Sequence, residues 1–369
     1  MLPTALTNVF RPARFQGRGR TRDYFEGYYL KVVDPEQDIA FALIPGLSYD
    51  GAGEGHAFIQ VMDGVRGQSA YERFDVGALS AGTVGASAKR RHPEARSWRG
   101  DFNEAARRDA FALAIGPHRF SESGMEVDVP SVTCRLTFRN NVPWPYRPWS
   151  PGAMGPFGFV PGMQCKHGVV SLHHGVSGTV RLGDGPEVEL SPRATGYVEK
   201  DWGSSFPLRW TWLQTNHLAA ETAPACLLVS AGHVPWLTGA FDGHIAALLL
   251  RGRLEVFATY NGSRLTQTIT EGRLHLRFER GGLLRRPRTW LTVTAPLPTA
   301  TARLAAPAPQ AGMAGHVNES LTASATVQYG HGARTLLSTT TQYTGLELGG
   351  AQPRAQPPGS PPPSHPPRP

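Results

Sequence analysis

Between residues 24 and 350 the chain is a succession of short apolar or alternating runs separated by glycine- and proline-rich turns. Early examples are YFEGYYLKVV, IAFALIPGL and HAFIQVMDG, and late ones are GRLHLRFERG, RTWLTVTAP and RTLLSTTTQYTGLELGG. Evenly spaced runs of this kind, with no helical pattern between them, are typical of β-barrels and sandwiches. The 42 glycines and 32 prolines, many at turn-like positions, support the same interpretation. We therefore predict an all-β fold of antiparallel strands.

The charge of the chain is the next constraint. The formal net charge is +8, but nearly all the basic residues are arginines, and the lysines are only Lys31, Lys89, Lys166 and Lys200. No nucleic-acid-binding motif accompanies them, so we predict no nucleic-acid partner. A basic surface would also be attracted to an anionic membrane face, and we keep peripheral membrane contact as an open expectation.

Cysteine usage and hydropathy bear on location. Cys134, Cys165 and Cys226 are odd in number and widely spaced, which predicts a reducing compartment without a disulfide framework. The arginine-rich lead, residues 1–20, has no apolar stretch of secretory length. The most apolar windows, residues 225–241 and 244–252, fall short of the roughly 20 unbroken apolar residues that span a bilayer. We predict a cytoplasmic protein, either free or peripheral to a membrane.

Two proline-rich stretches interrupt the strand pattern. Residues 140–164 carry several tryptophans and phenylalanines among their prolines and predict a long ordered loop or lid, or a connector whose aromatics cover a core edge. Residues 351–369 cannot bury an apolar face and predict a disordered, extended tail.

Three strand-like stretches place aromatic and polar side chains on one face, because side chains alternate along a strand. Such a face suits a cavity that holds an apolar ligand and steers its polar head. The alternative is a filled core in which these polar groups bond the backbone or one another. The residues that share faces in this way are Trp210, Trp212, Gln214 and Asn216; His56 and Gln60; and Glu26 and Tyr28.

Other motifs give weaker signals. Cys165, His167, His173 and His174 lie close together, but their spacing matches no standard zinc pattern, so we predict no metal site. The glycine-rich stretch at 46–58 opens no helix and therefore predicts no dinucleotide or phosphate loop.

Three stretches together resemble one family. YFEGYYLKV at 24–32, GHAFIQV at 55–61 and GYVEKDWGSSFPLRWTWLQTNHL at 196–218 resemble the motifs of the tocopherol cyclase family in their usual order, and GLELGG at 345–350 is also similar. The third stretch is the most specific. The resemblance spans roughly residues 20–350.

This resemblance implies a fold and a reaction. The fold is two lipocalin-like antiparallel β-barrel halves packed together, which we place at residues 21–185, including the Pro/Trp-rich loop, and 186–350. The reaction closes the chromanol ring of vitamin E: the prenyl double bond of a prenylated hydroquinone is protonated, and a phenolic oxygen captures the tertiary cation. The partner is then a small apolar prenylated quinol, and no cofactor is needed.

Two other functions stay open. An isoprenoid or carotenoid hydratase-like enzyme would let water capture the same cation, and a non-catalytic prenyl-lipid-binding protein would use the same pocket. The chain departs from the family pattern in having Tyr28 where Trp is usual and Asp201 where Asn is frequent. The oligomeric state is not predicted.

Protonating an alkene requires an acid held in a dry pocket. Glu199 is our first candidate, followed by Asp201 and then Glu26. If the segment is extended, Glu199 and Asp201 lie on one side and can share a proton, which would raise one pKa. Lys200 and Trp202 lie on the other side. The structural alternative for this run is an ion pair between Glu199 and Lys200.

The tertiary cation and the phenol set further requirements. Indole faces stabilise a desolvated cation by up to about 2 kcal/mol or more each, and Trp202, Trp210 and Trp212 are the candidate wall. The side chains that we expect to orient the phenol, with Tyr28 nearby, are Gln60, Gln214, Asn216, His56 and His217.

Overall fold

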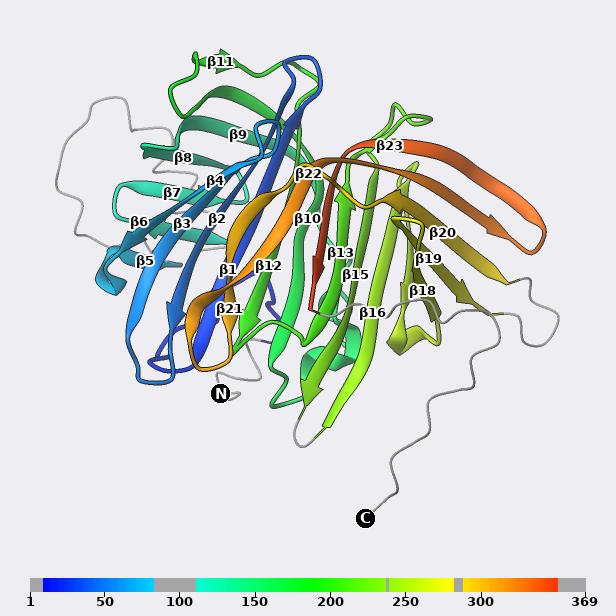
Figure 1. Cartoon of the computed structure of the whole chain (residues 1–369), viewed down its shortest axis with the longest axis horizontal. Helices are drawn as coiled ribbons and strands as arrows, with labels where there is room; N and C mark the ends of the chain where they lie inside the picture. Colours follow the sequence, from blue (N-terminus) through cyan, green and yellow to red (C-terminus); the bar gives the residue numbers. More distant parts are fainter. Residues whose placement is uncertain (1–8, 83–110, 237–238, 282–287, 351–369) are drawn as a thin grey trace.

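The protein consists of two curled antiparallel sheets that stand side by side (Figure 1). The computed structural model describes residues 9–82, 111–236, 239–281 and 288–350. Within these ranges there is no α-helix, and the prediction of an all-β fold with two lipocalin-like antiparallel halves is confirmed. The predicted tail at 351–369 lies outside the described residues.

The first sheet has twelve strands among the described residues, in the order β4-β3-β2-β1-β12-β10-β9-β8-β7-β6-β5, with β11 paired to β10. The strand bounds are β1 Tyr24–Asp34, β2 Ile39–Tyr49, β3 Gly55–Asp63, β4 Gln68–Phe74, β5 Leu79–Ala81, β6 Ala112–Ile115, β7 His118–Ser121, β8 Gly124–Val129, β9 Val132–Val142, β10 Cys165–Leu182, β11 Val188–Glu189 and β12 Thr195–Gly203.

The second sheet has eleven strands in the described part of the chain, in the order β17-β16-β15-β13-β23-β22-β20-β19-β18, with β14 paired to β23 and β21 to β22. The bounds are β13 Arg209–Thr215, β14 His217–Leu218, β15 Cys226–Trp236, β16 Gly239–Leu250, β17 Arg253–Ala258, β18 Arg264–Thr270, β19 Arg273–Arg280, β20 Thr289–Pro296, β21 Ala302–Ala308, β22 Gly312–His331 and β23 Arg334–Gly349; the short 3₁₀ helices are η1 Val76–Ala78, η2 Gly155–Phe159 and η3 Thr259–Asn261.

Three separate apolar cores hold the sheets together. One lies within the first sheet and includes Tyr28 and Phe111, and another lies within the second and includes Leu213. The third lies between the sheets and includes Tyr29 and Trp212. Because side chains alternate along β1, Tyr28 enters the first core while its neighbour Tyr29 enters the core between the sheets.

The chain passes from the first sheet to the second at the segment that follows Gly203. β12 pairs with β1 and β10, so Thr195–Gly203 belongs to the first sheet although it lies beyond residue 185. β13 pairs with β15 and β23 in the second. The division of the chain at 185 stays a prediction.

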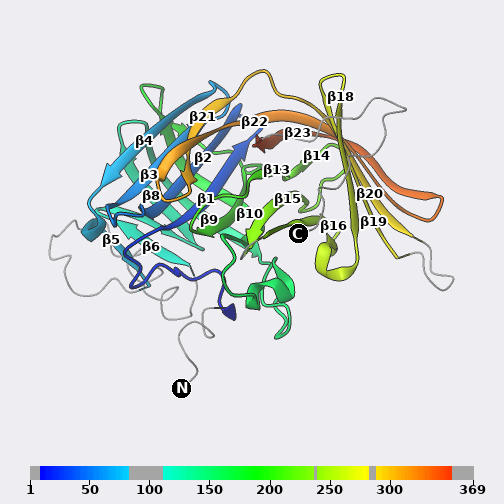
Figure 2. The same ribbon diagram turned by 60° about the horizontal axis from the view of Figure 1, so that its bottom comes forward.

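The hairpin of β21 and the start of β22 reaches back over the first sheet (Figure 2). The Ser69 hydroxyl donates a hydrogen bond to the carbonyl of Arg303 at 2.6 Å. The Ala305 amide donates to the Gln60 side chain at 2.7 Å. Strands from both ends of the sequence thus enclose the space between the sheets. In the described ranges no helix has the length and apolar character needed to cross a bilayer.

Candidate active site

A cavity of about 180 Å³ lies between the two sheets. Its walls come from β1, β2, β3, β10 and β12 of the first sheet and from β13, β15, β16, β21, β22 and β23 of the second. Most of its surface is apolar and aromatic, and only a few polar groups point into it. Those that can ionise are Cys165, His167, Glu199, Asp201, His244, Glu319 and Glu347, together with the tyrosines Tyr29 and Tyr260. This is the composition of a site for an apolar ligand with a polar head.

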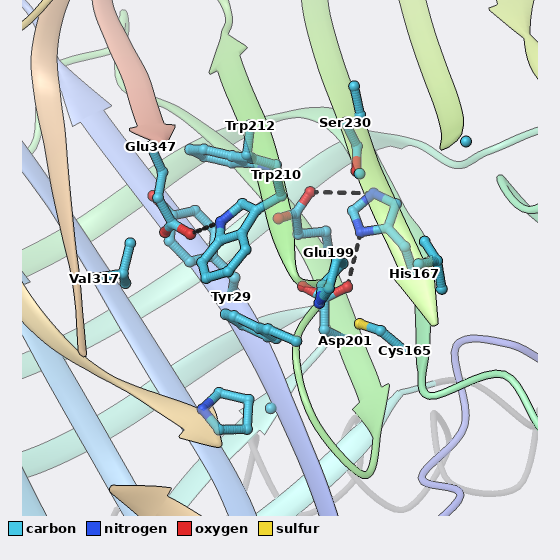
Figure 3. Close-up of a pocket in the computed structure, with 18 of the residues that line it drawn as sticks. Tyr29, Cys165, His167, Glu199, Asp201, Trp210, Trp212, Ser230, Val317 and Glu347 are labelled. Atoms are coloured by element: carbon cyan, nitrogen blue, oxygen red, sulfur yellow. Dashed lines mark hydrogen bonds and ion pairs between the residues drawn. The ribbon is translucent and has the colours of Figure 1, made fainter. Parts of the chain in front are cut away.

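His167 lies between two carboxylates (Figure 3). Its Nδ1 is 3.0 Å from Asp201 Oδ1, and its Nε2 is 3.6 Å from Glu199 Oε2. The arrangement follows from strand register, because His167 on β10 is the direct partner of Asp201 on β12 and Val169 is the partner of Glu199. Alternation along β12 then turns Glu199 and Asp201 to the same side.

Burial and neighbouring charges shift the pKa values of His167 and Glu199. Burial lowers the pKa of His167, but the charges of Glu199 and Asp201 outweigh it and raise that pKa to about 9. Burial raises the pKa of Glu199 to about 7, although the His167 charge opposes it. The Tyr197 hydroxyl also donates to Glu199 at 2.6 Å. Near neutral pH the cavity therefore holds an imidazolium beside a carboxyl group that can still carry its proton.

Two further glutamates line the cavity. Glu319 on β22 and Glu347 on β23 are direct partners in the strand register. Glu319 accepts a hydrogen bond from the Tyr29 hydroxyl. Glu347 accepts one from the Trp210 indole (Figure 3). Burial raises the pKa of Glu319 to about 7. Burial and then the charge of Glu319 raise the pKa of Glu347 well above its usual range.

Aromatic rings form the apolar wall. Tyr29 and Trp212 meet edge to face with ring centroids 5.2 Å apart, and Phe206 and Trp210 do the same at 5.2 Å. Met154 and Phe157 of the proline-rich loop add to the lining, so this loop covers part of the cavity as the prediction of a lid or aromatic cover required. Such a wall excludes water and presents ring faces to a cation.

His167, Glu199 and Asp201 also lie close enough to hold a metal ion, with ligand atoms within 4.8 Å of one another. A metal would need a neutral ring nitrogen as its ligand. Here both nitrogens of His167 face carboxylates, which favour the doubly protonated ring. The donor set fits an acid–base group better than a metal centre.

Five of the residues predicted from sequence line this cavity: Glu199, Asp201, Trp210, Trp212 and Gln60. The Gln60 amide is occupied on both sides by the backbone of Ala305, to which it donates at 3.3 Å and from which it accepts at 2.7 Å. Gln60 is therefore a structural part of the wall.

Glu26, Tyr28 and Trp202 lie on the opposite faces of their strands and do not line this cavity, which corrects their predicted placement. Glu26 forms a fully buried ion pair with Lys200 at 2.5 Å, so Lys200 pairs with Glu26 and not with Glu199. Tyr28 stacks on Phe111 in the first core. Trp202 lies against the Lys200 ammonium, 4.5 Å from the ring centroid.

The remaining predicted polar groups are also absent from the cavity wall, because each bonds elsewhere. His56 bonds the Tyr71 hydroxyl at 2.8 Å. The Gln214 side chain accepts from Lys31 at 3.1 Å, and Asn216 donates to the carbonyls of Leu172 and Ala225. His217 bonds Thr195 at 3.1 Å. The bonds of Gln214, Asn216 and His217 join the two sheets, whereas that of His56 lies within the first sheet.

Sequence reasoning missed His167, Tyr29, Glu319 and Glu347 as site residues. The sequence places His167 only in a Cys/His cluster whose spacing matches no zinc pattern, and alternation places Tyr29 on the strand face opposite Glu26 and Tyr28. Glu347 lies in GLELGG, which carried the resemblance but offered no partner. The signal for the pair is the single acid in each of two long strands, β22 and β23.

The chain is similar to a known protein family and to several solved structures. A family model described as tocopherol cyclase-like matches residues 158–350, more than half of the chain. The solved structures with a similar fold include CghA, with 12% identity over 88% of this chain and 87% of that chain and a TM-score of 0.50. The fold of CghA therefore resembles this one.

Two further structures match more loosely. A protein described as an AttH candidate from Nitrosomonas europaea has 12% identity, covers 88% of this chain and 92% of that chain, and gives a TM-score of 0.47. Kievitone hydratase from Nectria haematococca has 9% identity, covers 89% of each chain, and gives a TM-score of 0.42.

Proposed function

The chain belongs to the tocopherol cyclase-like family, and on that premise we propose that it is an enzyme of the isomerase class that closes a chromanol ring on a prenylated hydroquinone. The observation that carries the proposal is Glu199, a buried acid with a raised pKa, held beside the His167 imidazolium in an apolar cavity. The proposed substrate is an apolar prenyl lipid, and the reaction requires no redox cofactor.

The first step is proton transfer from the Glu199 carboxyl group to the prenyl double bond. A general acid works best when its pKa is close to the operating pH. The carboxylate that remains is stabilised by the imidazolium 3.6 Å away and by the Tyr197 hydroxyl. Both groups are in place before the reaction, so they lower the barrier without reorganisation. Asp201 orients His167 and keeps it charged.

The tertiary cation is then held among the ring faces. Trp210 and Trp212 on β13 lie on the same side of their strand and line the cavity. Cation–π contact in a water-poor site contributes on the order of 1–2 kcal/mol per ring. The phenolic oxygen of the same molecule captures the cation and closes the ring.

Capture by water is the second candidate. The Asp201 side chain is 28% exposed, so water can reach the polar end of the cavity. A hydratase-like enzyme would start from the same protonation and give a tertiary alcohol. The two products differ in mass, because hydration adds a water molecule and cyclisation does not.

The test is incubation of the purified protein with a prenylated hydroquinone under anaerobic conditions, followed by mass spectrometry. We expect a chromanol with the mass of the substrate. Glu199→Gln should abolish turnover without lowering the melting temperature. Glu187→Gln, which alters an exposed acid, should leave both the turnover and the melting temperature unchanged. Binding of the quinol without any product in the wild-type protein would instead establish a lipid-binding protein.

A further inference from the structure

We propose that Glu319 is the general base that accepts the phenolic proton during ring closure, with Glu347 as its partner; this assignment rests on the proposed function. The cavity would then carry two acid–base centres, the Glu199 group and the pair of Glu319 and Glu347. The pair would bind the hydroquinone head by its hydroxyl group.

The position of the pair supports this role. Glu319 and Glu347 are opposite each other on neighbouring strands of the second sheet, and both line the cavity. Glu199 enters the same cavity from the first sheet. In Figure 3 the Trp210 ring lies between Glu347 and Glu199. A substrate lying along these rings would have one carboxyl group at each end.

The surroundings of Glu319 and Glu347 affect the protonation of the two carboxyl groups differently. The groups that act on the pair are Tyr29 and Lys31 from β1, Glu199 and Asp201 from β12 and Trp210 from β13. The Tyr29 hydrogen bond and the Lys31 charge act on Glu319 and favour its ionised form. Glu347 lacks a cation among these influences and lies beside the charge of Glu319, so it keeps its proton. Near neutral pH Glu347 therefore keeps its proton, while Glu319, whose pKa burial raises to about 7, is ionised in part of the molecules and can then accept a proton.

With Glu199 as the proton donor and Glu319 as the proton acceptor, every bond formed in the reaction is matched by a bond broken. The Glu199 proton forms a C–H bond at one alkene carbon, the π bond breaks, and the other carbon becomes the cation. The phenolic oxygen forms the C–O bond while its O–H bond breaks, and that proton passes to the Glu319 carboxylate. The substrate is isomerised, Glu199 is left ionised and Glu319 protonated.

One proton must return before the next turnover. The Tyr29 hydroxyl bonds Glu319, and the charges of both Glu319 and Glu199 act on Tyr29. Glu319 loses this proton and Glu199 regains one by exchange with water, which reaches the cavity at the partly exposed Asp201. No oxidant is required in this cycle.

The deciding experiment varies the acidity of the phenol. In Glu319→Gln we expect kcat to fall by about 10²- to 10⁴-fold, the usual contribution of a general base. Hydroquinones with ring halogens lose their proton more easily, so the kcat of Glu319→Gln should be at least tenfold closer to the wild-type value with these substrates. In Glu199→Gln the same substrates should recover nothing, because the missing proton is the one given to the alkene.

Binding and stability are measured in parallel. The chromanol product should still quench tryptophan fluorescence in Glu319→Gln, and the melting temperature should fall little. Should that variant fail to fold, Tyr29→Phe serves instead. Losing the Tyr29 hydrogen bond raises the pKa of Glu319, so the acid-side limb of the pH–rate profile should move to higher pH.

The outcomes separate the two proposals. If the wild-type protein forms no chromanol, the proposed function fails. If it forms chromanol and Glu319→Gln retains its kcat, or loses it equally for every phenol, the base assignment is overturned while the function stands. An unmoved acid-side limb in Tyr29→Phe would overturn the assignment as well.

Discussion

Replacing His167 by glutamine tests the electrostatic core of the proposed mechanism. The change removes the imidazolium that lies 3.6 Å from Glu199 and keeps a polar side chain of similar reach. Glu199 must then leave its negative charge in a buried cavity without a cation beside it. We expect a slower enzyme whose activity persists to higher pH.

The magnitude follows from the geometry. Two unit charges 3.6 Å apart interact by about 4.6 kcal/mol at an effective dielectric constant of about 20. If half to most of this charge has developed in the transition state, kcat falls by roughly 30- to 1,000-fold. The loss of the imidazolium charge also raises the pKa of Glu199.

The sign of the pH effect is fixed by the protonation state that the reaction needs. The active form carries a protonated Glu199, so wild-type activity falls on the basic side as the pH rises through about 7. The need for an ionised Glu319 sets the separate acid-side limb. In His167→Gln the corresponding limb should move to higher pH. The assay is chromanol formation followed by chromatography at saturating quinol, from pH 5 to about pH 9.

Asp201→Asn is the matched comparison. The asparagine carbonyl can still accept the hydrogen bond from His167 Nδ1, so the ring keeps its orientation, but the pKa of His167 loses one of the charges that raise it. We expect a smaller loss of kcat than in His167→Gln. A basic limb in His167→Gln that stays where it is, or moves to lower pH, would refute the reasoning.

Three further predictions follow from other contacts. Lys200→Met leaves the buried Glu26 carboxylate without its cation and should reduce the free energy of unfolding in urea by about 3–5 kcal/mol; a loss under about 1 kcal/mol would contradict a buried ion pair. Trp212→Leu removes a ring from the cavity and should lower kcat by about tenfold, with KM changing little, because the ring acts on the cation more than on the neutral substrate. In chemical denaturation, the free energy of unfolding of Glu347→Gln should rise relative to that of the wild type as the pH increases above about 4.5, by up to about 1.4 kcal/mol per pH unit. The reason is that only the unfolded wild-type chain releases the Glu347 proton in this range. A difference in stability that does not depend on pH would show that Glu347 ionises normally.

Much of the fold followed from local sequence pattern. Alternation correctly separated Glu199 and Asp201 from Lys200 and Trp202, and Trp210 and Trp212 from Leu213. This worked because strand geometry fixes the side on which each residue lies. Pattern alone cannot tell which side meets a cavity when both sides of a strand are buried.

Strand β1 shows why the rest was not predictable. Tyr28 and Tyr29 are both almost fully buried, yet one enters the core of the first sheet and the other the cavity. The pairing of Glu319 with Glu347, and of His167 with Asp201, depends on strand register between distant segments. Register is set by the whole sheet, so neither pair could be found from spacing along the chain.

The location of the cavity between the two sheets has a consequence for how the protein can be divided. Glu199 is supplied by the first sheet and the Glu319–Glu347 pair by the second, so neither half alone holds both acid–base centres. Two fragments cut in the turn after Gly203 and mixed should regain turnover only as they associate, with a rate that depends on the concentration of both. The turnover recovered by the mixed fragments would then measure how tightly the two halves associate.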